Sequence, residues 1–164
     1  MMDAISEERL AQVAPGLATK IRQMADTLAA QGIYIRVVQG LRTVEEQDAL
    51  YAQGRTAPGK IVTNDSGLQS YHCYGLAVDC VPSLNGPDEP YNPDWTQSHP
   101  NWRTMWSLGQ SLGLTVGAFW TSFPDAPHFQ IQGPYPVGKP NEELQQMLTA
   151  QGTEAVWAAV GVAV

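Results

Sequence analysis

The sequence predicts an α+β domain in which a small antiparallel sheet carries helices on one of its faces. Amphipathic helical segments and short β-branched segments recur along the chain, and the connections between them are rich in the 15 glycines and 12 prolines. The 164 residues suit one domain with a substantial core. No internal repeat or low-complexity tract interrupts the pattern.

Two helices and a strand are predicted for the first 40 residues. Ser6 is a candidate N-cap for a short helix over 6–13. Pro15 suits the first turn of a second helix, which runs to about residue 30 with apolar residues every three or four positions. The β-branched and aromatic segment 33–39 is typical of a strand.

A third helix and a long loop follow the first strand. Thr43 is the expected N-cap, with Glu46 three residues later as its capping-box partner, and the helix ends near Gly54. Residues 55–69 are polar and contain glycine, so we expect one long loop there. Loops of that length in compact domains are usually functional or mobile.

The rest of the sheet is predicted from three short segments. Residues 76–81 form the central strand, 115–116 a short strand that breaks at a glycine, and 127–132 the last strand. A proline-rich loop and a helix over 99–112 separate the first two of these strands.

The C-terminal segment is predicted to be helical. Asn141 caps a helix to about residue 150, and Thr153 is a candidate cap for another. We expect residues 1–133 to form the catalytic domain, and residues 134–164, a Pro/Gly connector and these helices, to pack on the same domain.

Side-chain alternation places two ligand-type residues on one face of the sheet. In the central strand Asp79 points away from Val78, and in the last strand His128 points away from Phe129. If the two strands are neighbours, Asp79 and His128 share the open, more polar face.

The segment Ser70 to Asp79 completes a candidate metal site. Catalytic zinc takes three protein ligands and keeps one position open, and His72, Asp79 and His128 satisfy that count. Such an ion activates a water molecule and polarises a carbonyl. A carboxylate must then accept and pass on a proton, and Asp125 is the candidate. A hydrogen-bonded structural histidine, a turn cap at Asp79 and an Asx-turn at Asp125 are the alternatives.

Three other potential ligands receive structural interpretations. Cys73 neighbours His72, but adjacent residues of an extended chain point to opposite sides, so we expect it not to bind metal. Cys80 alternates with apolar residues and is expected to be a buried free thiol. His99 precedes a proline at a helix entry and is expected to be a structural surface residue.

Composition excludes several classes of partner. The formal charge of −7 and the absence of a Lys/Arg cluster argue against nucleic acid and against an anionic membrane surface. The start has no basic or apolar signal-peptide region, and the apolar stretch 155–164 is about half of the roughly 20 residues that a membrane span needs. We therefore expect synthesis in the cytoplasm and no stable membrane insertion.

The motifs resemble those of a known family. Ser-x-His-x-x-Gly-x-Ala-x-Asp at residues 70–79, followed by Asp-x-x-His at 125–128, is similar to the zinc peptidases that cut bacterial cell-wall peptides. That group includes D-Ala-D-Ala carboxypeptidases, vancomycin-resistance dipeptidases and phage endolysins, and hedgehog domains share its zinc-site plan. Segments 39–43, 45–55 and 59–63 most resemble the L-alanyl-D-glutamate endopeptidases, over about 38–132.

The resemblance implies a role for each matching residue. It places zinc on the two histidines and the aspartate already named, and gives Asp125 the acid/base role. Arg42 matches the arginine that stabilises the oxyanion, although a surface ion pair with Glu45 and Glu46 is the alternative. Ser70 matches a serine that contacts substrate, or else is a turn hydroxyl. Trp120 either walls the groove or packs in the core.

The activity that the resemblance implies is hydrolysis of the L-Ala–D-Glu bond in the peptidoglycan stem peptide by a monomeric zinc peptidase. Such an enzyme acts on the cell wall after release, through a phage holin as one route. A D-Ala-D-Ala carboxypeptidase on the same scaffold and a non-catalytic zinc-containing binding domain are the alternatives.

Overall fold

A four-stranded antiparallel sheet forms the centre of the protein, and its strand order is β1-β2-β4-β3. The computed structural model describes residues 2–164. The strands are β1 (Ile35–Gln39), β2 (Ala77–Pro82), β3 (Thr115–Val116) and β4 (His128–Gln130). Each predicted strand is present, and the predicted α+β class is confirmed.

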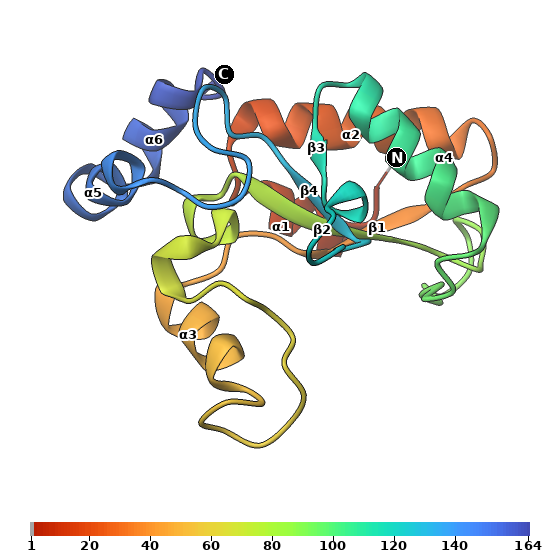
Figure 1. Cartoon of the computed structure of the whole chain (residues 1–164). Coiled ribbons are helices and arrows are strands. Elements are labelled where there is room, and N and C mark those ends of the chain that lie inside the picture. The colour runs from red at the N-terminus through yellow and green to blue at the C-terminus, as the bar shows by residue number, and fades with distance from the viewer. Residues whose placement is uncertain (1) are drawn as a thin grey trace.

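The described residues 2–164 also form six α-helices (Figure 1). They are α1 (Ala4–Leu10), α2 (Pro15–Ala29), α3 (Val44–Ala52), α4 (Pro100–Ser111), α5 (Glu142–Gln151) and α6 (Thr153–Val160). The 3₁₀ helices are η1 (Gly67–Gln69), η2 (Tyr71–Tyr74) and η3 (Gly117–Phe119). Figure 1 shows α2 and α4 on one side of the sheet, whereas α3 and the loop after it project from the other side.

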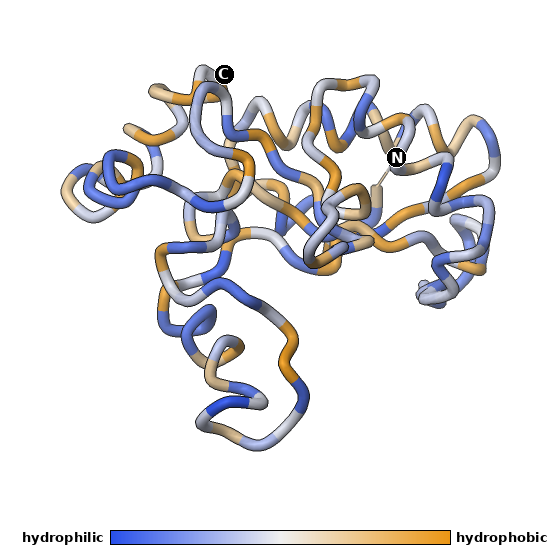
Figure 2. Tube along the Cα trace, in the orientation of Figure 1, coloured by the Kyte–Doolittle hydropathy of each residue, from blue (hydrophilic) through white to orange (hydrophobic). Residues whose placement is uncertain are grey.

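The two faces of the sheet differ in what covers them. Phe129 of β4 is fully buried beneath α4, where Gly109 lies so close that an added Cβ would meet the Phe129 ring at 2.5 Å. Val78, its partner on β2, is also fully buried. Figure 2 shows the corresponding contrast in hydropathy between the largely apolar strands and the polar surface segments. The face opposite the helices is therefore the one that Asp79 and His128 can occupy.

Helix caps explain where several elements begin. The Thr43–Glu46 capping box and the Asn141 cap form as predicted. The prediction of Ser6 as a cap is wrong: Asp3 caps α1 and accepts a hydrogen bond from the Ser6 amide. The Ser6 hydroxyl instead accepts from the amide of Val37 on β1. Thr153 is likewise not a cap, because it is already the first residue of α6.

The segment before β2 is helical, so the expectation of an extended chain around Cys73 is wrong. Ser70 caps the 3₁₀ helix η2, and Gly75 ends it in the left-handed conformation with φ of 62°. This tight turn brings His72 back towards the start of β2. Trp157 of α6 lies over Gly75, and its indole nitrogen donates to the carbonyl of Tyr74. The C-terminal segment thus contacts the turn that carries His72.

No helix within residues 2–164 is long and apolar enough to cross a membrane.

Candidate active site

The centre of the candidate site is a cross-strand pair. Asp79 of β2 lies directly opposite His128 of β4 in the antiparallel register. Directly opposed residues place their side chains on the same face and in contact. As a result, Asp79 Oδ1 lies 3.5 Å from His128 Nδ1. The two strands are therefore neighbours, as the shared face of Asp79 and His128 requires.

His72 reaches the same carboxylate from η2. Its Nε2 lies 3.3 Å from Asp79 Oδ1, and the rings of His72 and His128 meet edge to face with centroids 5.1 Å apart. The Nδ1 of His72 lies 2.9 Å from the carbonyl oxygen of Gly40. A carbonyl only accepts hydrogen bonds, so Nδ1 carries the proton and Nε2 presents a lone pair to Asp79.

The three side chains fit a metal ion. Their ligand atoms all lie within 4.8 Å of one another, and buried Asp79 Oδ1 has no hydrogen-bond partner in the described chain. Donors bound to tetrahedral zinc at about 2.0–2.1 Å stand about 3.3 Å apart. The separations of 3.3 and 3.5 Å from Asp79 to the two histidines match that value. The donor set of two imidazoles and one carboxylate therefore fits zinc, the predicted cofactor.

The electrostatics of the cluster favour a cation at its centre. Burial raises the pKa of Asp79, but positive charge on the facing imidazoles of His72 and His128 outweighs burial and holds that pKa far below its ordinary value. Burial lowers the pKa of His128, yet the Asp79 carboxylate raises it above its ordinary value overall. A buried carboxylate that draws positive charge is what a divalent ion would satisfy.

Asp125 lies beside the cluster on the turn that enters β4. Its Oδ2 is 3.9 Å from His128 Nδ1, and 39% of its side chain is exposed. The Asp125 amide donates to the carbonyl of Gly117, which fixes the turn. Burial, and then the charge of Asp79, raise the pKa of the Asp125 carboxyl above its ordinary value. A raised pKa makes a carboxyl a stronger base, which suits a group that has to accept a proton.

Arg42 reaches the cluster from the loop between β1 and α3. Its Nη2 lies 3.9 Å from Asp79 Oδ2, and its Nη1 donates to Oε1 of Gln47 on α3. Fully buried Gln47 also donates to the carbonyl of Asp65, so it connects Arg42 to the loop after α3. The Arg42 side chain is 12% exposed and faces the site, so it does not occupy the surface position that the Glu45–Glu46 alternative requires.

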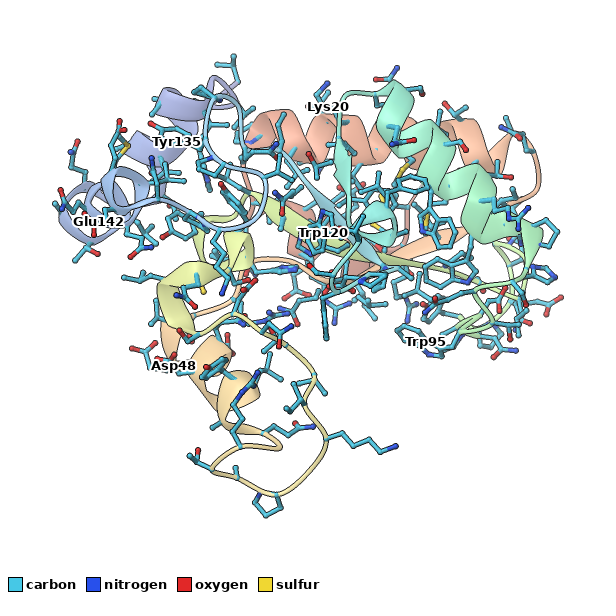
Figure 3. All side chains as sticks on the ribbon, in the orientation of Figure 1. Lys20, Asp48, Trp95, Trp120, Tyr135 and Glu142 are labelled. Carbon is cyan, nitrogen blue, oxygen red and sulfur yellow. The ribbon has the colours of Figure 1, made fainter. Side chains whose placement is uncertain are left out.

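Ser70 and Trp120 line the cavity over the cluster. The Ser70 hydroxyl accepts from the amide of His72, so it acts as the turn hydroxyl of η2 while also facing the cavity. Trp120 stacks near His128 with ring centroids 4.9 Å apart. Figure 3 shows Trp120 at the centre of the molecule, over the strands and away from α5.

The other potential ligands lie elsewhere. The Cys73 thiol lies against the carbonyl of Gly67, and burial raises its pKa to about 11. The expectation that Cys73 points away from the site assumed that its segment is extended. That assumption is wrong, since Cys73 lies in the 3₁₀ helix η2. Cys80 is a buried free thiol, as predicted. His99 is half-exposed and pairs with buried Asp94.

Two glutamines that contact site residues were missed from the sequence. Gln47 sits in the middle of α3 and contacts Arg42, and Gln130 follows His128 by two residues and contacts its Nε2. Only Gln130 carries a usable signal, because strand alternation puts a residue two positions after His128 on the same face of the strand.

Known proteins resemble this chain in sequence. The sequence profile of the D-alanyl-D-alanine carboxypeptidase family matches residues 63–131. The peptidoglycan L-alanyl-D-glutamate endopeptidase CwlK of Bacillus subtilis is 36% identical over 119 residues, which cover 68% of this chain and 71% of CwlK.

Solved structures resemble the chain as well. The L-Ala D-Glu endopeptidase ChiX of Serratia marcescens matches with a TM-score of 0.52 and 25% identity, over 77% of this chain and 86% of ChiX. The vancomycin-resistance D,D-pentapeptidase VanY, solved with Zn(II), matches with a TM-score of 0.49 and 16% identity, over 83% of this chain and 77% of VanY.

An antiparallel sheet whose open face carries two histidines, an aspartate and an adjacent carboxyl is typical of a metal-dependent hydrolase. The relationship to CwlK and the family profile narrow that class to a metallopeptidase. The chain belongs to the D-alanyl-D-alanine carboxypeptidase family of peptidases.

Proposed function

We propose that this protein is a zinc-dependent peptidoglycan peptidase that hydrolyses the L-Ala–D-Glu bond of the stem peptide, in endolysin-type lysis or in remodelling of the cell wall. The observation that carries the proposal is the Asp125 carboxyl, which stands beside the three-ligand cluster in an open cavity. The choice of bond is supported by the two relatives named as endopeptidases for it.

The shape of the cavity supports cleavage of an internal bond. A cavity of about 250 Å³ lies over the metal cluster, and a second of about 440 Å³ adjoins it. Both cavities are lined by Val62, Thr63, Asp65, Trp120, Asp125 and Gly138. A groove that continues past the cluster leaves room for substrate beyond the bond that is cut, which an endopeptidase needs.

The proposed roles follow from the positions of the side chains. Zinc held by His72, Asp79 and His128 would supply an activated water molecule and polarise the scissile carbonyl. Asp125 accepts a proton and returns it to the leaving amine. Arg42, held by Gln47, donates hydrogen bonds to the oxygen on which negative charge develops. Trp120 and Ser70 form walls of the substrate site.

The proposal also includes the setting in which the protein works. In this proposal residues 134–164 pack on residues 1–133 as one domain. Two hydrogen bonds support it: the Gly16 amide donates to the Val162 carbonyl, and the Trp157 indole donates to the Tyr74 carbonyl. The protein acts as a monomer. It reaches the wall after release from the cytoplasm, with a phage holin as the proposed route.

Digestion of purified peptidoglycan tests the function. New N-terminal D-Glu together with C-terminal L-Ala, formed by the zinc-loaded protein and abolished by a chelator, is the expected result. Free D-Ala in place of those ends would identify the carboxypeptidase alternative. An intact wall with zinc still bound would identify a non-catalytic zinc domain and reject the proposal.

A further inference from the structure

Gln130 is a buried amide placed behind one of the candidate ligands. It follows His128 by two residues on β4, so both side chains lie on the same face of the strand. Only 1% of Gln130 is exposed, and its Oε1 lies 2.8 Å from His128 Nε2. That nitrogen is the ring atom opposite the one that faces Asp79.

The orientation of the Gln130 amide is determined by its other partners. Its Nε2 donates to the carbonyl of Val137 at 2.9 Å and to Oε1 of Gln132 at 3.2 Å. If the amide were flipped, its oxygen would face these two acceptors and both hydrogen bonds would be lost. The amide oxygen must therefore point at His128.

This fixed oxygen selects one tautomer of the histidine. An amide oxygen only accepts, so Nε2 of His128 carries the ring proton. The lone pair of the neutral ring is then on Nδ1, the atom that faces Asp79 Oδ1. The Gly40 carbonyl acts on His72 in the same way but on the opposite ring nitrogen.

We propose that Gln130 is a positioning residue for the metal site, which holds His128 with Nδ1 towards the ion and is itself held by the Val137 carbonyl of the C-terminal connector. The inference rests on the proposed function only in taking zinc as the ion. The connector lies beyond residue 131, where the match to the family profile ends. A segment outside that match thus supports a ligand inside it.

Two substitutions separate this role from general stability. Gln130→Met keeps the size of the side chain and removes the acceptor, whereas Gln130→Glu keeps an acceptor for His128 and removes the donors. Gln132→Met is the matched control: it removes one partner of the Gln130 amide and leaves the contact with His128. Each variant of the 164-residue chain is loaded with zinc, which is then withdrawn by a chelating indicator. The unfolding midpoint of each metal-free form is measured in parallel.

The expected result is a zinc dissociation constant about 10–100-fold higher for Gln130→Met, as for other partners of ligating histidines. Gln130→Glu should recover most of that affinity, and Gln132→Met should bind zinc like the wild type. If Gln130→Met also binds like the wild type, or if all three variants lose affinity in step with their unfolding midpoints, the positioning role is wrong.

A second readout needs neither zinc nor activity. Long-range proton–nitrogen NMR of the metal-free protein at alkaline pH should show His128 protonated on Nε2 in the wild type and a mixture of tautomers in Gln130→Met. A wild-type ring protonated on Nδ1 overturns the inference. Wild-type protein that fails to bind zinc or to cut peptidoglycan would instead count against the proposed function, and the tautomer measurement would still decide the role of Gln130.

Discussion

Asp79 and His128 are opposite residues of β2 and β4, and the carboxylate of the first lies 3.5 Å from Nδ1 of the second. The pairing belongs to the backbone ladder, so the hydrogen-bonded sheet determines the spacing between these two ligands. Only His72 must be brought in from outside the sheet, by the η2 turn. The site therefore rests on rigid elements, which suits a preorganised metal centre.

Replacement of Asp125 should separate metal binding from catalysis. Asp125→Asn keeps the shape of the side chain but cannot accept the proton, so we expect kcat to fall by about 10²–10⁴-fold. The zinc content should stay at that of the wild type because Asp125 is outside the three-ligand cluster. Asp88→Asn, an exposed residue that does not line the groove, is the control. Loss of zinc together with activity would make Asp125 a ligand and contradict the assignment.

Activity should fall even when Arg42 is replaced by lysine, the other basic residue with a long side chain. A lysine cannot keep the contact with Gln47 and the forked donors together, so Arg42→Lys should reduce kcat by about 10²–10³-fold with zinc retained. Gln47→Leu should give a smaller fall, since it frees the guanidinium without removing it. Steady-state kinetics on a stem-peptide substrate measures both, with exposed Arg103→Lys as control. Unchanged kcat in Arg42→Lys would return Arg42 to a structural role.

Gly117 is expected to be intolerant of any side chain. A Cβ there would meet the carbonyl oxygen of Asp125 at 2.6 Å and the Cβ of His128 at 2.9 Å. Gly117→Ala should therefore displace the turn that carries Asp125 and destabilise the protein by about 1–3 kcal/mol. Gly86→Ala meets nothing within 4 Å and is the control. The midpoint of thermal unfolding and the activity should both fall in Gly117→Ala and stay unchanged in Gly86→Ala. A fully active Gly117→Ala would show that the Asp125 turn does not depend on close contact with Gly117.

The charge of Asp3 should stabilise the fold in a pH-dependent manner. Burial raises its pKa, but hydrogen bonds from Ser6 and the ion pair with Arg36 outweigh burial and lower it. A lowered folded-state pKa means that the stabilisation is complete above the unfolded value of about 3.9 and is lost as the pH falls through the folded value. Because 37% of the side chain is exposed, solvent screening limits the effect to less than about 1 kcal/mol.

Asp3→Asn tests that effect, since asparagine still caps a helix but carries no charge. Metal-free forms of both proteins are compared by thermal unfolding, so that metal binding does not contribute. The variant should be less stable at neutral pH and equal to the wild type at strongly acidic pH. If the stability difference between the two proteins persists or grows in acid, the Asp3 charge does not stabilise the fold in the predicted direction.

Much of the site followed from local patterns in the sequence. Strand alternation put Asp79 and His128 on one face, and the Thr43 capping box depends on residues only three apart. Patterns of that range need no knowledge of the tertiary structure. The 3₁₀ helix around His72 was missed because its tight turn depends on Gly75 and on the Trp157 contact from the far end of the chain.

The supporting residues show why the rest was not predictable. Gln47 looks like any polar residue of a helix until the loop after α3 folds over it, and the partner of Gln130 in the C-terminal connector is set by tertiary contact alone. Asp3 displaced Ser6 as the cap because the Ser6 hydroxyl is used by β1, a contact 31 residues away in sequence. Amides and hydroxyls have several possible partners, and only the folded chain selects among them.

The most direct test of the metal centre is anomalous X-ray diffraction at the zinc absorption edge, on crystals of the zinc-loaded protein. We predict one strong peak within about 2.0–2.2 Å of His72 Nε2, Asp79 Oδ1 and His128 Nδ1 together. A peak that lacks any one of these three atoms as a neighbour, or no peak at the sheet face at all, would contradict the account.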